Sequence, residues 1–286
     1  MRRSFRAAVD RAADGTSDAA GAAVAAALAQ VAKIRGAKAV HPHGVSYGAR
    51  FIVDGAPAAP ADCELLSAQA EWPAIVRFSR SVGLPRPLPD LLGMSIRVLS
   101  AHGEDRHQDF LLVTSVDLPL LRHIFLPATD VQQRLYSSSL PYRSGSRTFL
   151  VGARPDPGSP RPDGSDEFDR LAKAADSGQL RFEFVLASPL GRFERIGEMQ
   201  IGSRLPDEID ALRYNPFNTG ADLMPIGTLN RWRRTAYPSS QRAWGATDRR
   251  ALAQDRAETE LRALASIEEP LRKGMPAPAD PTGPSS

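Results

Sequence analysis

Short extended segments separated by turn residues constrain the fold of this chain most strongly. Four such segments follow one another over residues 40–53, 74–79, 94–99 and 109–114. The loops between them are rich in proline, glycine and aspartate, which end strands rather than continue them. Consecutive strands joined by short turns predict an antiparallel meander or barrel.

Two further strands and a helix are predicted in the second half of the chain. Leu180, Phe182, Phe184 and Leu186 alternate with more polar residues, as one buried face of a sheet requires. Residues 195–201 have the same extended character. Residues 154–165 are rich in proline and glycine and are predicted to form a loop, followed by a helix over 166–175.

Helical segments are predicted at both ends of the chain. Ser17 and Asp18 can cap a helix over residues 17–35, and helices are expected over 229–242 and 248–271. The final residues, 274–286, have the composition of a disordered tail. We therefore expect an α+β fold with an N-terminal helical segment (1–36), a barrel domain (37–245), a C-terminal docking helix (246–273) and the tail.

Composition excludes several classes of function. The 36 basic and 33 acidic residues give a net charge of only +3, without a continuous basic block, so we expect no nucleic-acid partner. Cys63 is the single cysteine, so no internal disulfide can form. The alanine-rich stretch 19–32 is too short and too weakly apolar for stable membrane insertion, and a cytoplasmic location is expected.

Two clusters of residues suggest chemistry when they are considered together. Residues 38–44 read KAVHPHG and residues 233–242 read RRTAYPSSQR. Arg233 stands four residues before Tyr237, so both side chains share one face of a helix. A neighbouring cation favours the phenolate form of a tyrosine, which ferric iron prefers as a ligand.

These clusters resemble the catalase superfamily, which has a distal histidine in a Val-His-Ala-Lys-Gly run and a haem-ligating tyrosine in a Tyr-Pro run. The resemblance implies a catalase-like antiparallel β-barrel that binds haem b. It makes Tyr237 the iron ligand and His41 the distal catalytic residue. Val40, Arg233 and Arg242 become contacts to the cofactor, and Lys38 stands where the family has an arginine.

The resemblance continues between the two clusters, over about residues 38–242. Residues 76–79 read VRFS, as in a catalase strand whose arginine faces a haem propionate and whose serine hydrogen-bonds the distal histidine. Because strand side chains alternate, Arg77 and Ser79 share a face, as these two roles require. Phe125 resembles the phenylalanine that stacks on the porphyrin ring in this family.

One segment departs from the family pattern. Residues 109–116 read DFLLVTSV where catalases supply a distal asparagine, and Thr114 is the candidate catalytic residue in its place. Without the asparagine, efficient dismutation of hydrogen peroxide is not expected. The chain is most similar to the compact catalase-related peroxidases and allene oxide synthases, which implies a more open pocket for organic or lipid hydroperoxides.

The expected function is therefore that of a haem-dependent peroxidase, an oxidoreductase with weak or no catalase activity. Its partners would be a hydroperoxide substrate and an unidentified electron donor, and the sequence allows a homo-oligomer. A fatty-acid hydroperoxide isomerase or dehydratase is an alternative that uses the same pocket residues. A catalase-like protein that only carries or senses haem is another.

Other interpretations of single residues stay open at this point. His41 and His43 could form a metal pair on one strand, and Tyr47 and Tyr214 compete with Tyr237 for any tyrosine role. Residues 102–107 read HGEDRH and resemble a metal site, although a polar hairpin loop is the favoured interpretation.

Overall fold

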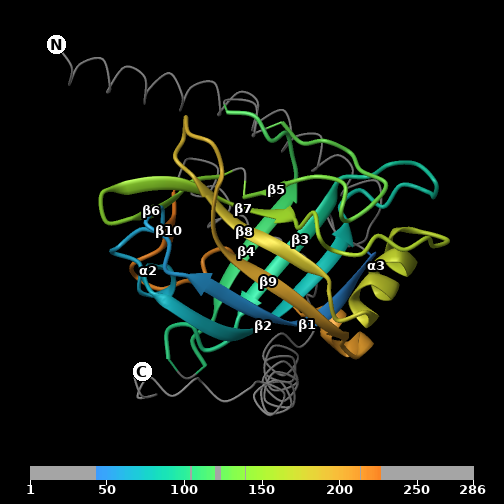
Figure 1. The fold of residues 1–286 in the computed structure, drawn as a ribbon, viewed down its shortest axis with the longest axis horizontal. Helices are drawn as coiled ribbons and strands as arrows, with labels where there is room; N and C mark the ends of the chain where they lie inside the picture. Colours follow the sequence, from blue (N-terminus) through green and yellow to red (C-terminus); the bar gives the residue numbers. More distant parts are fainter. Residues whose placement is uncertain (1–42, 104, 120–123, 139, 213, 227–286) are drawn as a thin grey trace, which may run out of the picture.

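The computed structural model describes residues 43–103, 105–119, 124–138, 140–212 and 214–226 (Figure 1). The predicted helices over 17–35, 229–242 and 248–271 and the predicted tail lie outside this part of the chain. The domain boundaries at residues 36, 245 and 273 therefore stay predictions. The same holds for the candidate site residues Lys38, Val40, His41, Arg233, Tyr237 and Arg242.

One antiparallel sheet of ten strands dominates the described residues. Its strands are β1 (His43–Asp54), β2 (Gln69–Arg80), β3 (Leu92–Val98), β4 (Gln108–Thr114), β5 (Tyr136–Ser137), β6 (Tyr142–Ser144), β7 (Arg147–Pro155), β8 (Arg181–Ala187), β9 (Glu194–Arg204) and β10 (Met224–Pro225). Their order is β10-β6-β7-β5-β4-β3-β2-β1-β9-β8, and β7 also pairs with β8. This last pairing closes eight of the strands into a barrel, from which β6 and β10 extend, and so confirms the predicted fold class.

Three short helical segments accompany the barrel in the described part of the chain: α2 (Glu64–Ser67), α3 (Glu167–Asp176) and the 3-10 turn η1 (Asp207–Ala211). Helix α3 begins after Asp166, whose side chain accepts hydrogen bonds from the backbone N–H groups of Phe168 and Asp169. It buries Leu171, Ala174 and Ala175 at one end of the barrel, where Figure 1 shows it beside β9.

No helix of the described residues is long and apolar enough to span a membrane.

The interior of the barrel is filled by side chains. Val45 pairs with Phe78, Phe78 with Met94 and Met94 with Leu112, so each of these strands points every second residue inward. The aromatic rings of Phe51 and Phe184 meet edge to face at 4.8 Å, and further rings pack around them. The fully buried aromatic residues of this core are Tyr47, Phe51, Phe78, Phe110, Tyr136, Phe182 and Phe184. The barrel is therefore a packed core and not a channel, and any ligand site must lie outside it.

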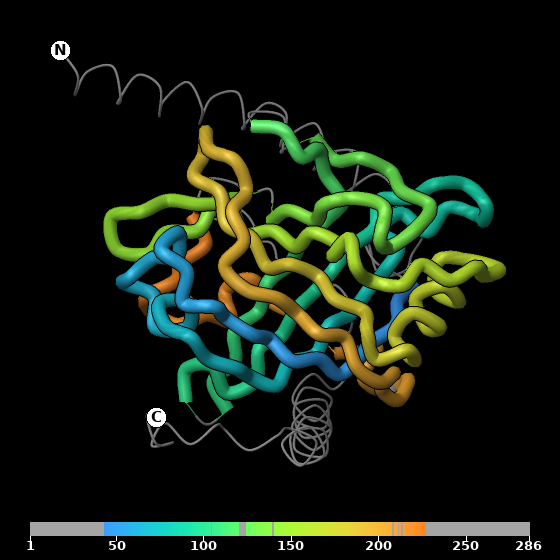
Figure 2. The backbone as a smooth tube through the Cα atoms, viewed as in Figure 1, coloured from blue at the N-terminus to red at the C-terminus, as the bar shows by residue number. Residues whose placement is uncertain are grey.

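A network of charged side chains closes the end of the barrel at which β2 turns into β3. Arg80 Nη1 lies 2.9 Å from Glu167 Oε1, and Arg80 Nε lies 3.4 Å from Asp90 Oδ2. Arg86 also donates to Glu167, at 3.0 Å. Figure 2 shows the loops after β2 and β7 at the same end as α3. The network thus joins the barrel wall to its longest helix among the described residues.

The structure corrects the sequence prediction between residues 115 and 155. Strands β5, β6 and β7 were not predicted, and β7 continues through Pro155, two residues into the predicted loop. Both faces of β7 are covered, because Val151 packs in the barrel core and Leu150 packs outside it against Val185 and Phe193. A strand buried on both faces has no alternating pattern to detect.

Candidate functional site

Arg77 and Ser79 lie together on the outer face of β2, as the alternation of the strand predicts. They alternate with Val76 and Phe78, which belong to the barrel core. Both are almost completely buried, at 7% and 1% exposure. Across the strand pairings, Ser79 is opposite Gly44 of β1 and Gly93 of β3. This outer row is the part of the predicted site that the structure describes.

The guanidinium of Arg77 is held against the backbone of β1. Its Nε donates to the carbonyl oxygen of Asp210 at 3.1 Å. A Cβ atom on Gly44 would lie 2.6 Å from Arg77 Cζ and 2.7 Å from the carbonyl oxygen of Phe78. Burial lowers the pKa of Arg77, but an arginine stays charged at any physiological pH. Position 44 therefore has to be glycine so that this cation can occupy its place.

Serines face Arg77 from the neighbouring strands on both sides. Ser46 is opposite Arg77 on β1, and Ser95 is opposite Arg77 on β3. Ser46 is fully buried, and its hydroxyl has no hydrogen-bond partner in the part of the chain that the structure describes. The part of the face between Gly44 and Ser95 thus combines the cation of Arg77, glycine and serine positions of little side-chain volume, and the hydroxyl of Ser46. These features fit a flat group that bears carboxylates.

A second cation is fixed beside this face by a buried ion pair. Arg97 donates two hydrogen bonds to Asp109, each 2.7 Å long. The ring of Tyr214 lies 5.2 Å from the Arg97 guanidinium, and Asp109 also accepts from the backbone N–H of Asn215 at 2.8 Å. The pair therefore neutralises Arg97 and anchors the segment around residue 214 to β4.

Thr114, the candidate catalytic residue of the 109–116 segment, does not belong to this outer face. It follows Leu112 and Phe110 at alternate positions of β4, and both of these side chains lie in the barrel core. Thr114 is fully buried, and its hydroxyl accepts a hydrogen bond from the backbone N–H of Leu92 at 3.1 Å. Thr114 thereby satisfies the backbone N–H group at the start of β3.

Phe125 lies on the loop after β4 and is half-buried. It forms an isolated bridge with Ser115, one residue beyond the end of β4. The backbone N–H of Leu126 donates to the carbonyl oxygen of Thr114, which fixes this loop to the strand. Phe125 is therefore held at the end of the barrel to which Ser79 also belongs, and its ring-stacking role stays a prediction.

The competing tyrosines have structural roles in the described residues. Tyr47 points into the barrel core, where its ring contacts Phe78 edge to face at 6.2 Å. Burial raises its pKa to about 12. Tyr214 packs on Arg97, and burial raises its pKa as well, although Arg97 opposes this shift. Neither phenol is prepared to ionise as an iron ligand requires.

The histidines at residues 102 and 107 stabilise a loop, as the favoured interpretation held. His107 Nδ1 accepts from the backbone N–H of Ser100 at 3.0 Å, and His102 Nε2 lies 3.0 Å from Gln108 Oε1. Over the described ranges no three His, Cys, Asp or Glu side chains gather as metal ligands would.

Sequence reasoning missed the contributions of Ser46 and of the Arg97–Asp109 pair. Ser46 had no signal, because a single serine in a strand is common. Arg97 and Asp109 lie at the ends of two predicted strands, and only their register brings them face to face. Gly44 was recognised by resemblance alone, and the contact with Arg77 supplies its physical reason.

Comparisons with known proteins give a fold but no close relative. No protein-family model matches the chain, and no curated protein matches its sequence. Solved structures of catalases are similar to it. A fungal catalase has a TM-score of 0.54 at 12% identity, with 72% of this chain and 59% of that chain covered. A bacterial catalase gives 0.51 at 13%, with 74% and 58% covered.

Catalase A from Saccharomyces cerevisiae has a TM-score of 0.53 at 11% identity, and the match covers 72% of this chain and 60% of the yeast chain. The chain thus spans about 60% of the length of the catalases it matches. Identities this low establish architecture alone. The chain therefore has a catalase-like fold, an antiparallel barrel of eight strands.

Proposed function

We propose that this chain binds one haem b against the outer face of the barrel and reduces organic or lipid hydroperoxides, with weak or no catalase activity. The observation that carries the proposal is the common outer face of Arg77 and Ser79 beside Gly44. In the sequence, His41 stands three residues before Gly44, whose strand partner is Ser79. We infer that His41 and Ser79 serve one distal site.

The chemistry of the outer face supports a porphyrin rather than a bulky ligand. Gly44, Ser79 and Gly93 lie side by side across three strands and present little side-chain volume. Arg77 supplies a buried positive charge, which suits a propionate through a charge-assisted hydrogen bond. Lys38 is proposed as the partner of a propionate as well.

The proposed roles divide between the two sides of the cofactor. When bound, haem supplies the iron redox chemistry that cleaves the peroxide O–O bond. His41 moves the proton between the two peroxide oxygens, and Ser79 holds the imidazole in one tautomer. Tyr237 is the iron ligand, and Arg233 keeps its phenol ionised.

Weak catalase activity follows from the residues around β4. Val113 lies next to Gly93 in the outer row, and Thr114 faces the core. No amide in this segment of β4 can therefore orient hydrogen peroxide beside Ser79. Larger hydroperoxides depend less on such a contact, because the rest of the molecule binds them. This supports an activity of the compact catalase-related type.

Absorption spectra of the purified full-length protein, expressed with sufficient haem supply, test the proposal. The wild type should show a Soret band, and Tyr237→Phe should shift or abolish it. His41→Ala should keep the band and lose hydroperoxide turnover. Tyr214→Phe is the matched control and should leave the spectrum unchanged, because its phenol has no hydrogen-bond partner among the described residues.

Two results would contradict this assignment. A wild-type protein without a Soret band would exclude haem chemistry, and an unchanged spectrum in Tyr237→Phe would exclude this iron ligand. Product analysis with a fatty-acid hydroperoxide distinguishes the activities. An alcohol product supports reduction, whereas an allene oxide or epoxide would show that the chain is an isomerase or dehydratase.

A further inference from the structure

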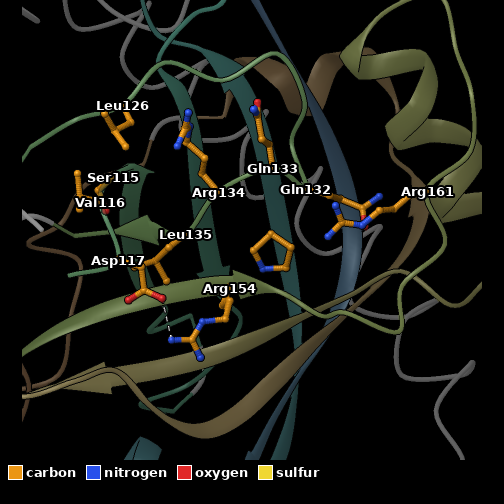
Figure 3. Close-up of a pocket in the computed structure, with 11 residues that line it drawn as sticks. Ser115, Val116, Asp117, Leu126, Gln132, Gln133, Arg134, Leu135, Arg154 and Arg161 are labelled. Atoms are coloured by element: carbon orange, nitrogen blue, oxygen red, sulfur yellow. Dashed lines mark hydrogen bonds and ion pairs between the residues drawn. The ribbon is translucent and has the colours of Figure 1, made fainter.

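A cavity that is open to solvent lies on the outside of the barrel, between the end of β4 and the end of β7. Its volume is about 410 Å³, which is in the range of small-molecule sites. The walls include the apolar side chains of Val116, Leu126 and Leu135 (Figure 3). Polar and cationic side chains line the rest, so the cavity is amphipathic. It shares none of its lining residues with the proposed haem face.

Three arginines line this cavity, and two of them keep an unbalanced charge. Arg154 is paired with Asp117 and Glu183, both at 3.1 Å, and Figure 3 shows the first of these pairs. Arg134 donates its Nε to the carbonyl oxygen of Pro127 at 2.9 Å but has no acidic partner among the described residues. Arg161 likewise has no ion pair within the described ranges. Arg134 and Arg161 are therefore the two lining cations that a ligand can pair with, although Asp117 and Glu183 together outweigh the charge of Arg154.

Two buried polar atoms in the cavity wall have no hydrogen-bond partner within the described ranges. They are the hydroxyl oxygen of Ser115 and Oε1 of Gln132, whose residues are 2% and 3% exposed. Unpartnered buried polar atoms are rare, because each costs free energy unless a ligand or water satisfies it. The orientation of the Gln132 amide is fixed, since its Nε2 donates to the carbonyl oxygen of Pro160 at 3.0 Å. Oε1 therefore requires a donor.

Each of these two residues is hydrogen-bonded to the backbone next to one of the two arginines. Gln132 is bonded to Pro160, the neighbour of Arg161 in the chain. The backbone N–H of Ser115 donates to the carbonyl oxygen of Leu135, the neighbour of Arg134. Figure 3 shows Gln132 and Arg161 at one side of the cavity and Ser115 at the other. Ser115 and Gln132 thus lie at opposite sides of the cavity, with polar side chains such as Arg134 as well as the apolar Leu135 between them.

We propose that this cavity binds an aliphatic dicarboxylate with a hydroxyl group next to one carboxylate. Arg161 holds that carboxylate, and the hydroxyl donates to Oε1 of Gln132. The second carboxylate accepts from Arg134 and from the hydroxyl of Ser115. The methylene chain lies between Val116, Leu126 and Leu135. The two ligand charges match the two unbalanced arginines, and the site does not depend on the haem proposal.

Calorimetric titration of the full-length protein tests the proposal, with 2-hydroxyadipate as the probe. We expect saturable binding to one site. Adipate lacks the hydroxyl and 2-hydroxyhexanoate lacks the second carboxylate, so each should bind about tenfold more weakly, as for the loss of one hydrogen bond to a charged or buried group. Inorganic phosphate and ADP should bind more weakly than 2-hydroxyadipate.

Substitutions of the lining residues test whether the ligand binds in this cavity. Arg161→Ala and Ser115→Ala should each weaken binding of 2-hydroxyadipate by about tenfold without lowering the unfolding temperature, since among the described residues the Ser115 hydroxyl has no hydrogen-bond partner and Arg161 has no ion pair to lose. Arg192→Ala is the matched control, an exposed arginine outside the lining of this cavity, and should bind like the wild type. Three results would overturn the proposal: no binding, tighter binding of phosphate or ADP, or an equal loss in Arg192→Ala.

Discussion

The charged network at the end of the barrel allows a quantitative test of the fold. Glu167→Gln keeps the shape of the side chain and removes its charge. Arg80 then remains 5% exposed with only Asp90 as an acidic partner, at 3.4 Å. Removing one partner of a buried pair costs about 3–5 kcal/mol, and the remaining Asp90 places this variant at about 3 kcal/mol.

Urea denaturation of the wild type and the variant measures this change. The midpoint should fall while the slope of the transition stays constant, and the melting temperature should fall by about 6–12 °C for about 3 kcal/mol in a domain of this size. Lys173→Gln is the control on the same helix. Its ion pair with Asp169 is 51% and 34% exposed, so this change should cost less than about 0.5 kcal/mol.

The pH dependence of the stability difference between the wild type and Glu167→Gln shows whether the charge of Glu167 causes it. Burial raises the pKa of Glu167, but hydrogen bonds from Arg86 and Arg80 outweigh it and leave the pKa below its usual value. A lowered pKa in the folded state stabilises the protein above the unfolded pKa of about 4.3, and this stabilisation is lost as the pH falls through the folded pKa. The wild type and Glu167→Gln should therefore converge below about pH 4. Equal stabilities at pH 7, or a difference that persists in acid, would refute the reasoning.

Three further predictions concern the outer face and the core. Gly44→Ala should displace Arg77 and cost about 1–3 kcal/mol in unfolding free energy. Gly158→Ala is the control and should be nearly neutral, because its added Cβ would meet only the flexible side chain of Asp156, at 3.1 Å. Equal costs in the two variants would show that the space around Gly44 is unimportant. Asp109→Ala should cost about 3–5 kcal/mol in a urea titration because it removes the buried carboxylate that pairs with Arg97, whose side chain is 8% exposed, and a loss below about 1 kcal/mol would contradict the contribution of this pair. Tyr47 has a pKa of about 12, so the tyrosinate absorbance of folded wild type and of Tyr47→Phe should coincide up to about pH 11, and a smaller signal in the variant at pH 10 would place this phenol in solvent.

The strands with one polar face were predictable, and the closure of the barrel was not. Phe182, Phe184 and Leu186 alternate in the sequence and are buried in the structure, and Asp166 caps α3 where its side chain predicts a helix start. Strand β7 escaped detection because packing on both faces removes the alternation. Its pairing with both β5 and β8 joins residues that are distant in sequence, and a single sequence has no local signal for such pairings.

The candidate site was predictable only where the alternation of side chains along one strand determines which residues share a face. Arg77 and Ser79 share a face because they are two residues apart, and the structure agrees. Thr114 was placed by resemblance to a segment that differs in its key residue, and strand register turns it to the other face. The register also decides the partners of Arg97 and Gly44, and it depends on contacts across strands.

Because the interior of the barrel is filled, substitutions on the inner face of β2 and substitutions on its outer face have different consequences in evolution. Positions 74, 76 and 78 contribute to the core, so their substitution changes stability first. Positions 77 and 79 face outward and can be replaced without disturbing that packing. A lineage with this barrel can therefore acquire or lose an activity through alternate residues of one strand while the scaffold stays the same.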